Sequence, residues 1–288
     1  MNSIAFALSL AFVAAAAPAC EASPQTAGFD GKRAWKDVET QVGFGPRTIG
    51  SRAHAKLVDW VQAELKKAGW APSVEEADHG QAKIRNVVGK RGQGTPWIIL
   101  GAHFDSRFVA DRDPDPAKRS LPVPGANDGA SGVAVLLELA RVLPKDLGKR
   151  VWLVFLDAED NGEIPGWDWI LGSKAFAAGL KDDPDAVIIV DMIGDADLNI
   201  LREGYSDEGL TDEIWAVAAR LGFSQFIDRR GYEILDDHLP FLQKGIRAVD
   251  IIDLDYPYWH TTADTPDKVS AESLRAVGET LRVWLVGR

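Results

Sequence analysis

Short, almost entirely apolar runs recur along this chain, and they constrain its fold more than any other feature. The run RVWLVFL at residues 150–156 is typical of a strand that is covered on both faces, since a half-exposed strand would alternate apolar and polar residues. Comparable runs lie at 97–100, 186–190 and 248–252. Helical segments separate these runs, and strands that alternate with helices predict an α/β fold with a mainly parallel sheet.

The helical segments are identified by the spacing of their apolar residues. At residues 51–69 apolar side chains recur at helical spacing, and Gly69 is a typical helix stop. Further helices are predicted at 132–143, 173–180, 211–221 and from 270 nearly to the C-terminus. No linker or internal repeat divides these elements. We therefore predict a single α/β domain over residues 30–288, with a mixed, mainly parallel central sheet flanked by helices.

The first 22 residues predict a signal peptide. Residues 4–19 are apolar or small throughout, which is shorter than the roughly 20 residues that a membrane-spanning helix needs. Ala17-Pro18-Ala19 fits cleavage at small residues and directly precedes Cys20, the only cysteine. Two exported forms are therefore open: a periplasmic or secreted protein, and a lipoprotein anchored to a bacterial membrane through Cys20. No transmembrane segment is expected in the mature chain, and a lone cysteine leaves it without an internal disulfide.

The charge balance narrows the range of partners. The composition is that of an ordinary globular protein, with 46% hydrophobic and 26% charged residues. The formal net charge of −11 argues against a nucleic-acid partner, because phosphate binding requires a basic face and no cluster of Lys and Arg offsets the acidic total. We expect a monomer.

Acidic and imidazole side chains follow the predicted strands, at the edge of the sheet where α/β proteins form their sites. Converging carboxylates would raise one another's pKa values, and only Arg107 lies close in sequence to neutralise them. A divalent cation would remove this conflict. The residues at these positions are His103, Asp105, Asp128, Asp157, Glu159, Asp160, Asp191 and His260.

The residue types favour zinc over other divalent ions. Imidazole and carboxylate ligands without a thiolate suit zinc, whereas an all-oxygen set would suit magnesium or calcium. In the pair Glu159-Asp160, one carboxylate can bind the metal while its neighbour accepts a proton. A calcium site that only stabilises loops is the alternative.

A set of motifs makes the chain resemble a known family, the zinc aminopeptidases and glutaminyl cyclases that share one α/β fold. The resemblance extends from about residue 30 to the end of the chain and implies a zinc exopeptidase-like fold acting on peptide or protein N-termini. The motifs stand in the family's order: His103-Phe104-Asp105-Ser106, GANDGASG at 125–132, Glu159-Asp160, Asp191, Asp236-Asp237-His238 and Trp259-His260-Thr261.

The glutaminyl cyclase branch implies one zinc ion and the conversion of an N-terminal glutamine to pyroglutamate with release of ammonia. By resemblance, Glu159 carries the proton from the α-amine to the departing ammonia, and Asp191 and Asp236 assist this transfer. The implied zinc ligands are Asp128, Asp160 and His260.

The aminopeptidase branch implies two zinc ions that share Asp128, with Glu159 activating a water molecule for attack on the N-terminal peptide bond. The second ion would be held by His103 and Asp191. All of these ligands are present, so both branches stay open. A homologue that binds peptides or metal without turnover is a third possibility, although the intact Glu159 speaks against it.

Three features favour the cyclase branch. Trp259 precedes His260, where the cyclases place an indole wall, and Asp236-Asp237 matches their doubled aspartate. The long segment after Glu159 resembles the cyclase loop that carries a pocket tryptophan, for which we expect Trp167. Rigid indole walls suit a short glutamine side chain. Trp259 and Trp167 are therefore the predicted substrate-binding residues.

Several residues depart from the pattern or stay ambiguous. Asp160 stands where the family usually has a glutamate, so the metal or the strand end must sit slightly closer. The Asp- and Pro-rich segment 109–124 is expected to be a solvated loop, although its acidic residues could also favour a cationic N-terminus. His54 and His79 are expected at the surface, and His238 is not expected to bind metal.

Overall fold

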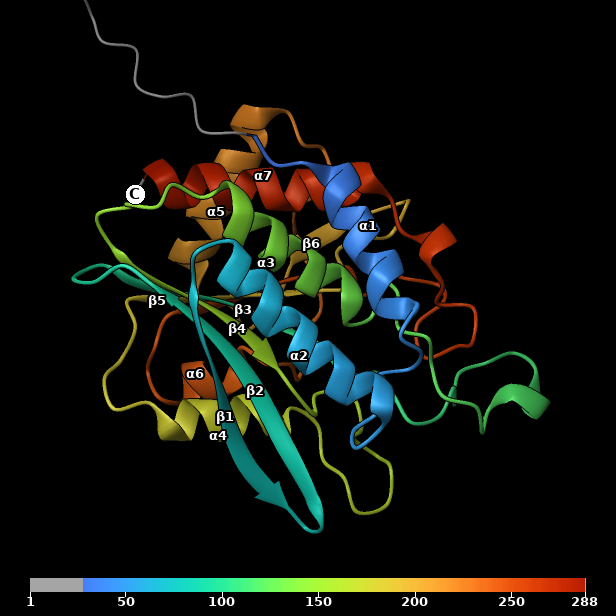
Figure 1. Cartoon of the computed structure of the whole chain (residues 1–288). Helices are drawn as coiled ribbons and strands as arrows, with labels where there is room; N and C mark the ends of the chain where they lie inside the picture. Colours follow the sequence, from blue (N-terminus) through green and yellow to red (C-terminus); the bar gives the residue numbers. More distant parts are fainter. Residues whose placement is uncertain (1–27, 288) are drawn as a thin grey trace, which may run out of the picture.

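The structure is a computed structural model that describes residues 28–287, and it has a six-stranded central sheet between two layers of helices (Figure 1). The strand order is β1-β2-β4-β3-β5-β8. β4, β3, β5 and β8 are parallel, while β1 and β2 form an antiparallel hairpin at one edge. The predicted mixed, mainly parallel sheet is therefore confirmed. The strands are β1 (Ala71–His79), β2 (Ala82–Arg91), β3 (Trp97–His103), β4 (Arg150–Leu156), β5 (Ala186–Asp191) and β8 (Ala248–Ile252).

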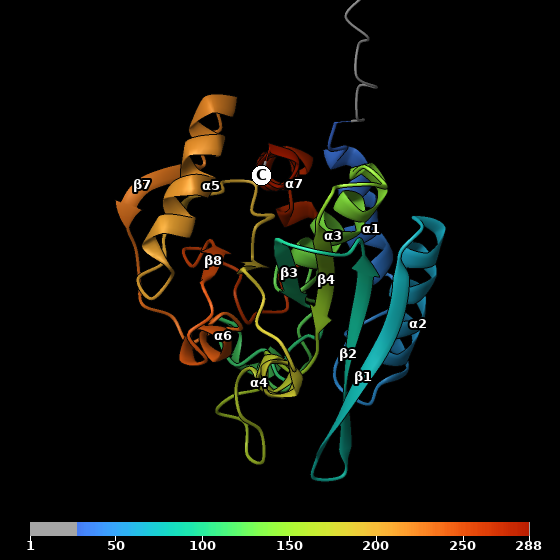
Figure 2. The ribbon, with the colours of Figure 1, turned by 90° about the vertical axis from the view of Figure 1, so that its left-hand side faces the viewer.

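Helices cover both faces of this sheet, as the view along its edge shows (Figure 2). The larger layer shares one hydrophobic cluster with the sheet and consists of α1 (Gly31–Val42), α2 (Arg52–Lys67), α3 (Ala130–Val142), α5 (Glu208–Leu221) and α7 (Ala271–Gly287). The opposite face packs against α4 (Leu171–Gly179) and α6 (Leu239–Gln243).

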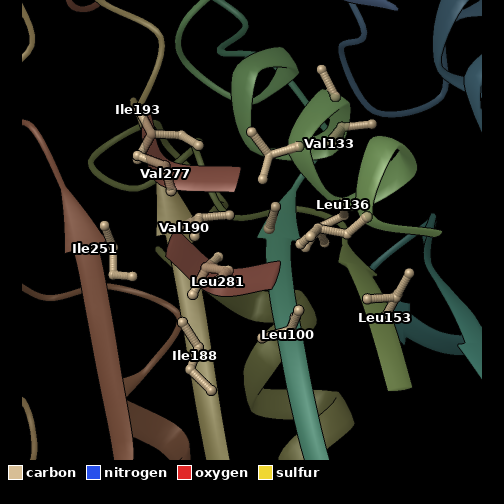
Figure 3. Packing of buried hydrophobic residues seen from close by; sticks show 14 of the residues in the cluster. Leu100, Val133, Leu136, Leu153, Ile188, Val190, Ile193, Ile251, Val277 and Leu281 are labelled. Atoms are coloured by element: carbon tan, nitrogen blue, oxygen red, sulfur yellow. The ribbon is translucent and has the colours of Figure 1, made fainter. Parts of the chain in front are cut away.

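The apolar runs form strands because their apolar side chains are buried against helices on both faces of the sheet. In β3, Leu100 belongs to the cluster under α3 and α7, whereas the adjacent Ile99 belongs to the cluster on the opposite face. Figure 3 shows Leu100 and Ile188 of the sheet in the same cluster as Leu136 of α3 and Leu281 of α7. Burying one such aliphatic side chain contributes about 1.5–3 kcal/mol. The prediction of strands covered on both faces is thus confirmed.

The structure also contains elements that the apolar pattern did not predict. They are α1, the β1–β2 hairpin, α6, a small parallel pair of β6 (Ile200–Arg202) and β7 (Phe226–Arg230), and the 3-10 turns η1 (Pro116–Lys118) and η2 (Pro266–Lys268). The hairpin escapes a search for apolar runs because β1 is an edge strand, largely half-exposed, that carries Glu75, Glu76 and Asp78.

The predicted signal segment 1–22, with Cys20, lies outside the described residues, so export and lipidation remain predictions. Within residues 28–287, none of the helices has the length and apolar character needed to cross a bilayer.

Candidate metal centre and substrate cavity

The carboxyl ends of the parallel strands bring the predicted site residues together. Parallel strands end at the same edge of a sheet, so residues distant in sequence become neighbours there. These residues are all buried, and they comprise His103 at the end of β3, Asp128 before α3, Glu159 and Asp160 after β4, Asp191 at the end of β5 and His260 after β8.

Two groups of three side chains could each hold a metal ion, with the ligand atoms of each group within 4.8 Å of one another. The groups are Asp128, Asp160 and His260, and His103, Asp128 and Asp191. His260 Nε2 lies 2.8 Å from Asp160 Oδ1, and His103 Nε2 lies 3.0 Å from Asp191 Oδ1. Asp128 joins both groups, since its carboxylate lies 3.1 Å from His103 and 3.8 Å from His260.

Unpartnered polar atoms at this edge indicate that the residues fit a cation. Asp128 Oδ2 and Asp160 Oδ2 are buried without a hydrogen-bond partner among the described residues. A buried polar atom without a partner costs about 1–3 kcal/mol, and two such carboxylate oxygens beside an imidazole would gain a partner from a bound cation. An imidazole with two carboxylates is a donor set that zinc accepts.

The electrostatics of the carboxylates lead to the same conclusion. Burial, together with the charge of Asp128, raises the pKa of Asp160 to about 6. Burial also raises the pKa of Asp191 to about 7 and that of Glu159 well above its ordinary value. A bound cation would favour the ionised form of each group and offset these shifts.

Asp105 holds the Glu159–Asp160 pair in place. Its buried carboxylate accepts hydrogen bonds from the backbone N–H of Glu159 at 3.0 Å and of Asp160 at 3.3 Å. The same carboxylate lies 3.5 Å from His103 Nδ1. Asp105 thereby connects the end of β3 to the end of β4 and orients a residue of each metal group.

Backbone strain is concentrated beside the site residues. Ala158, Met192 and His260 have φ values of 57°, 45° and 55°, although none is glycine. The left-handed region costs such residues about 1–3 kcal/mol and is retained where the surroundings require it. Ala158 precedes Glu159, and Met192 follows Asp191. The strain therefore turns the chain so that these side chains face the site.

A cavity of about 290 Å³ opens over the metal groups. Its volume is near the lower end of the range of about 300–1,000 Å³ that is usual for small-ligand sites. Its lining includes the titratable residues Asp128, Glu159, Asp160, Asp191, Asp236 and His260. The remaining wall is mainly apolar and consists of Trp169, Met192, Glu233, Ile234, Leu235, Ile252, Leu254 and Trp259.

Two indole rings flank His260 in this cavity. The Trp259 ring stacks on the imidazole with centroids 3.8 Å apart, and the Trp169 ring lies nearly parallel to it at 6.0 Å. Trp169 comes this close to the chain because residue 162 is glycine, where a Cβ atom would lie 2.1 Å from the indole. The predicted position of Trp259 at the cavity agrees with the structure.

The structure does not place Trp167 at the cavity. Its ring packs instead against His79 at 5.0 Å and Phe108 at 5.2 Å, in a separate hydrophobic cluster. Trp169 takes the position expected for Trp167. The choice between the two depends on the turn between Gly166 and Ile170, which both have positive φ values, and residue spacing alone does not reveal that turn.

Behind the cavity, Asp236 is backed by further buried acidic groups. Burial and the neighbouring charge of Asp236 raise the pKa of Asp250 well above its ordinary value. His238 Nε2 lies 3.1 Å from Glu203 Oε2, with both side chains fully buried. His238 belongs to neither metal group. Glu203 also accepts a hydrogen bond from the backbone N–H of Ile234, which ties the cavity wall to this buried pair.

His54 is buried, contrary to the expectation of a surface position. It is only 2% exposed, and its Nε2 lies 2.9 Å from Asp157 Oδ1. Asp157 also accepts a hydrogen bond from the backbone N–H of Arg85. The pair therefore joins α2, β2 and the loop after β4. The burial of His54 could not be predicted from its position on an amphipathic helix, because its partner Asp157 lies about a hundred residues away in the sequence.

Two further residues that support the site were not anticipated from the sequence. Asp264 accepts hydrogen bonds from the backbone N–H groups of Asn127 at 2.8 Å and Asp128 at 3.2 Å. The fully buried Arg47 donates to the backbone carbonyls of Phe104 and Gly125. Both residues hold the loop that carries Asp128, and both come from distant parts of the chain.

Comparison with known proteins agrees with this geometry. Residues 86–285 match the sequence profile of peptidase family M28. Glutaminyl-peptide cyclotransferase of Drosophila melanogaster is 26% identical over 258 residues, which cover 76% of this chain and 70% of the relative. A glutaminyl cyclase of Bacteroides thetaiotaomicron, solved with N-acetylhistamine, is 33% identical with a TM-score of 0.85, and the match covers 92% of this chain and 100% of that one.

A Zn-dependent exopeptidase from Parabacteroides distasonis is about as similar to this chain as the glutaminyl cyclase is. It is 32% identical with a TM-score of 0.87, and the match covers 91% of this chain and 100% of that one. The relatives are thus enzymes of both kinds that the sequence resembles, and the zinc exopeptidase-like fold is confirmed. From the extent of these matches it follows that the chain belongs to peptidase family M28.

Proposed function

We propose that this enzyme is a zinc-dependent glutaminyl-peptide cyclotransferase, which converts the N-terminal glutamine of peptides or proteins to pyroglutamate and releases ammonia. One observation carries the proposal: the carboxylates of Glu159, Asp191 and Asp236 and the indole rings of Trp169 and Trp259 line the same small cavity. Ring closure of a glutamine side chain needs both a proton carrier and rigid walls that fold the side chain back on its own amine.

Asp128, Asp160 and His260 are the residues that would hold the zinc ion, since their ligand atoms converge and two of the carboxylate oxygens lack other partners among the described residues. Zinc bound there would act as a Lewis acid and polarise the carbonyl of the γ-amide. The carboxylate of Asp160 reaches His260, so an aspartate, although shorter than the glutamate that is usual at this position, is compatible with the site.

Glu159 is positioned to carry the proton. Its carboxylate takes a proton from the α-amine as the amine nitrogen bonds to the γ-amide carbon, and it then gives that proton to the nitrogen that leaves as ammonia. Burial raises the pKa of Glu159, whereas a bound zinc ion would lower it again, and a group that must both accept and donate a proton needs these two effects to oppose each other. Asp191 and Asp236 line the same cavity and would accept hydrogen bonds from the N–H groups of the neutral amine, which keeps the amine beside Glu159.

The alternative is a dinuclear-zinc aminopeptidase. One observation favours it: His103, Asp128 and Asp191 form a second assembled group with the spacing of metal ligands. In the cyclase, His103 would instead donate a hydrogen bond to Asp191 at 3.0 Å and so orient it. The two activities require different substrates, and this difference allows a direct test.

The test is mass spectrometry of two peptides incubated with the zinc-loaded protein, one beginning Gln-Phe and one beginning Leu-Phe. We expect the glutamine peptide to lose the mass of ammonia while the leucine peptide stays intact. A glutamine peptide with an acetylated N-terminus is the control and should not react, because its nitrogen cannot attack. Release of free leucine would establish the aminopeptidase instead.

A second prediction compares two tryptophans of the same loop. Trp169→Ala removes a cavity wall and is expected to lower kcat/KM for the glutamine peptide by at least about tenfold, because the side chain is no longer held in the cyclising conformation. Trp167→Ala, two residues away, removes an indole that packs outside the cavity. It should lower thermal stability but change kcat/KM little. Equal losses of kcat/KM in both variants would contradict the assignment of Trp169.

A further inference from the structure

We propose that Asp111 is a positioning residue for metal binding, and that residues 111–113 form a strap that holds the segment 259–262 in its functional conformation. The inference rests on the proposed metal centre, because it concerns the ligand His260. Residues 111–113 belong to the Asp- and Pro-rich segment 109–124, in which Asp113 is buried while Asp111 and Arg112 lie at the surface.

The Asp111 carboxylate is fixed by Arg107. This guanidinium is only 1% exposed, and it donates from Nε to Asp111 Oδ1 at 3.0 Å and from Nη2 to Oδ2 at 2.8 Å. A two-point arginine–carboxylate pair has a defined geometry as well as strength. Arg107 Nη1 also donates to the backbone carbonyl of Asp160 at 3.0 Å. Asp111 is therefore held in a fixed relation to another predicted metal ligand.

From this position Asp111 faces the side of the His260 ring that points away from the metal group. Asp111 Oδ1 lies 3.4 Å from His260 Nδ1, while His260 Nε2 lies 2.8 Å from Asp160 Oδ1. A carboxylate at Nδ1 holds a proton there, which leaves the lone pair of Nε2 free for a metal. The 3.4 Å separation is long for a hydrogen bond, so the contact orients the ring chiefly through charge.

The next two residues of the strap hold the backbone of the same segment. The N–H of Arg112 donates to the carbonyl of His260 at 3.2 Å, and its guanidinium lies 5.5 Å from the Trp259 ring centroid. Asp113 accepts from the backbone N–H of Thr262 at 2.9 Å and from its hydroxyl at 2.5 Å. His260 needs such support because its φ of 55° is unfavourable for a residue with a side chain.

The experiment measures zinc affinity by competition with a chromophoric chelator, so its readout does not depend on turnover. Asp111→Ala is expected to weaken zinc binding by about 10- to 100-fold, the usual cost of losing a carboxylate behind a histidine ligand. Asp111→Glu should recover part of this loss. The matched control is Asp115→Ala on the same loop, because the carboxylate of Asp115 accepts from the N–H of Ala117 instead. It should bind zinc like the unmodified protein.

Each outcome has a distinct meaning. Equal zinc affinity in Asp111→Ala and the unmodified protein overturns this inference and leaves the cyclase proposal intact. Absence of zinc binding by the unmodified protein overturns the metal centre itself. If Asp111→Ala does not fold, Asp111→Asn keeps the shape of the side chain and decides the question by the same titration. Melting curves of the chelator-treated variants separate a loss of zinc affinity from a loss of the fold.

Discussion

Glu159→Gln is expected to lower kcat for cyclisation of the glutamine peptide by a factor of about 10²–10⁴, while the zinc content stays unchanged. The amide has nearly the shape of the carboxylate, so the cavity wall is preserved, but it cannot take a proton from the α-amine. Glu159 is not a member of either metal group, and its backbone is held by Asp105 through the N–H of residue 159, which the substitution leaves in place.

The measurement combines steady-state kinetics with metal analysis of the same preparation. Glu163→Gln is the matched control, because it makes the same chemical change at an exposed position in the loop that follows. The control should retain full activity. Unchanged activity in Glu159→Gln at unchanged zinc content would remove Glu159 from the mechanism, whereas a loss of zinc would show that it supports the metal centre rather than the proton transfer.

Asp128→Ala is expected to abolish zinc binding and to lower activity by at least about 10³-fold, whichever of the two activities the enzyme has. The reason is that Asp128 is the one residue shared by both groups of potential metal ligands. Its buried Oδ2 atom lacks a hydrogen-bond partner among the described residues, so the substitution removes no hydrogen bond of that atom. Zinc per protein chain is measured by elemental analysis, and chelator-treated unmodified protein is the reference for folding.

The companion variant His103→Ala gives the number of ions. His103 belongs only to the second group, so a one-zinc cyclase should retain its full zinc content. A dinuclear enzyme should lose about one ion per chain. A normal zinc content in Asp128→Ala would contradict both ligand sets at once.

The parts of the fold that could be predicted from the sequence are those in which a residue's environment follows from its immediate neighbours. β4 and β8 have the bounds expected from their apolar runs, in which Arg150 at the start of β4 and Asp250 within β8 are the only charged residues. The β1–β2 hairpin could not be found in this way. Its pairing joins Ala71 to Lys90 and His79 to Ala82, and its half-exposed, charged residues resemble those of a loop.

The site residues, too, divide into those that could be predicted from the sequence and those that could not. Its residues could be named because each follows a predicted strand or lies in a distinctive motif, as in Asn127-Asp128-Gly129, and their convergence follows from the parallel sheet. The sequence could not choose between Trp167 and Trp169, because the turn that separates their environments depends on φ values at Gly166 and Ile170. It also did not reveal the supports of the site, such as Asp264 beneath Asp128.

The sequence by itself therefore determined the fold class, the family resemblance and the chemical types of the site residues. Only the tertiary structure decided which indole faces the cavity, that His54 is buried against Asp157, and that Asp111 lies behind His260. The physical reason is the range of the interactions involved. Apolar periodicity is set by residues a few positions apart, whereas an ion pair such as that between Asp111 and His260 joins residues from distant parts of the chain. Such a pair exists only after the sheet and its helices have brought them together.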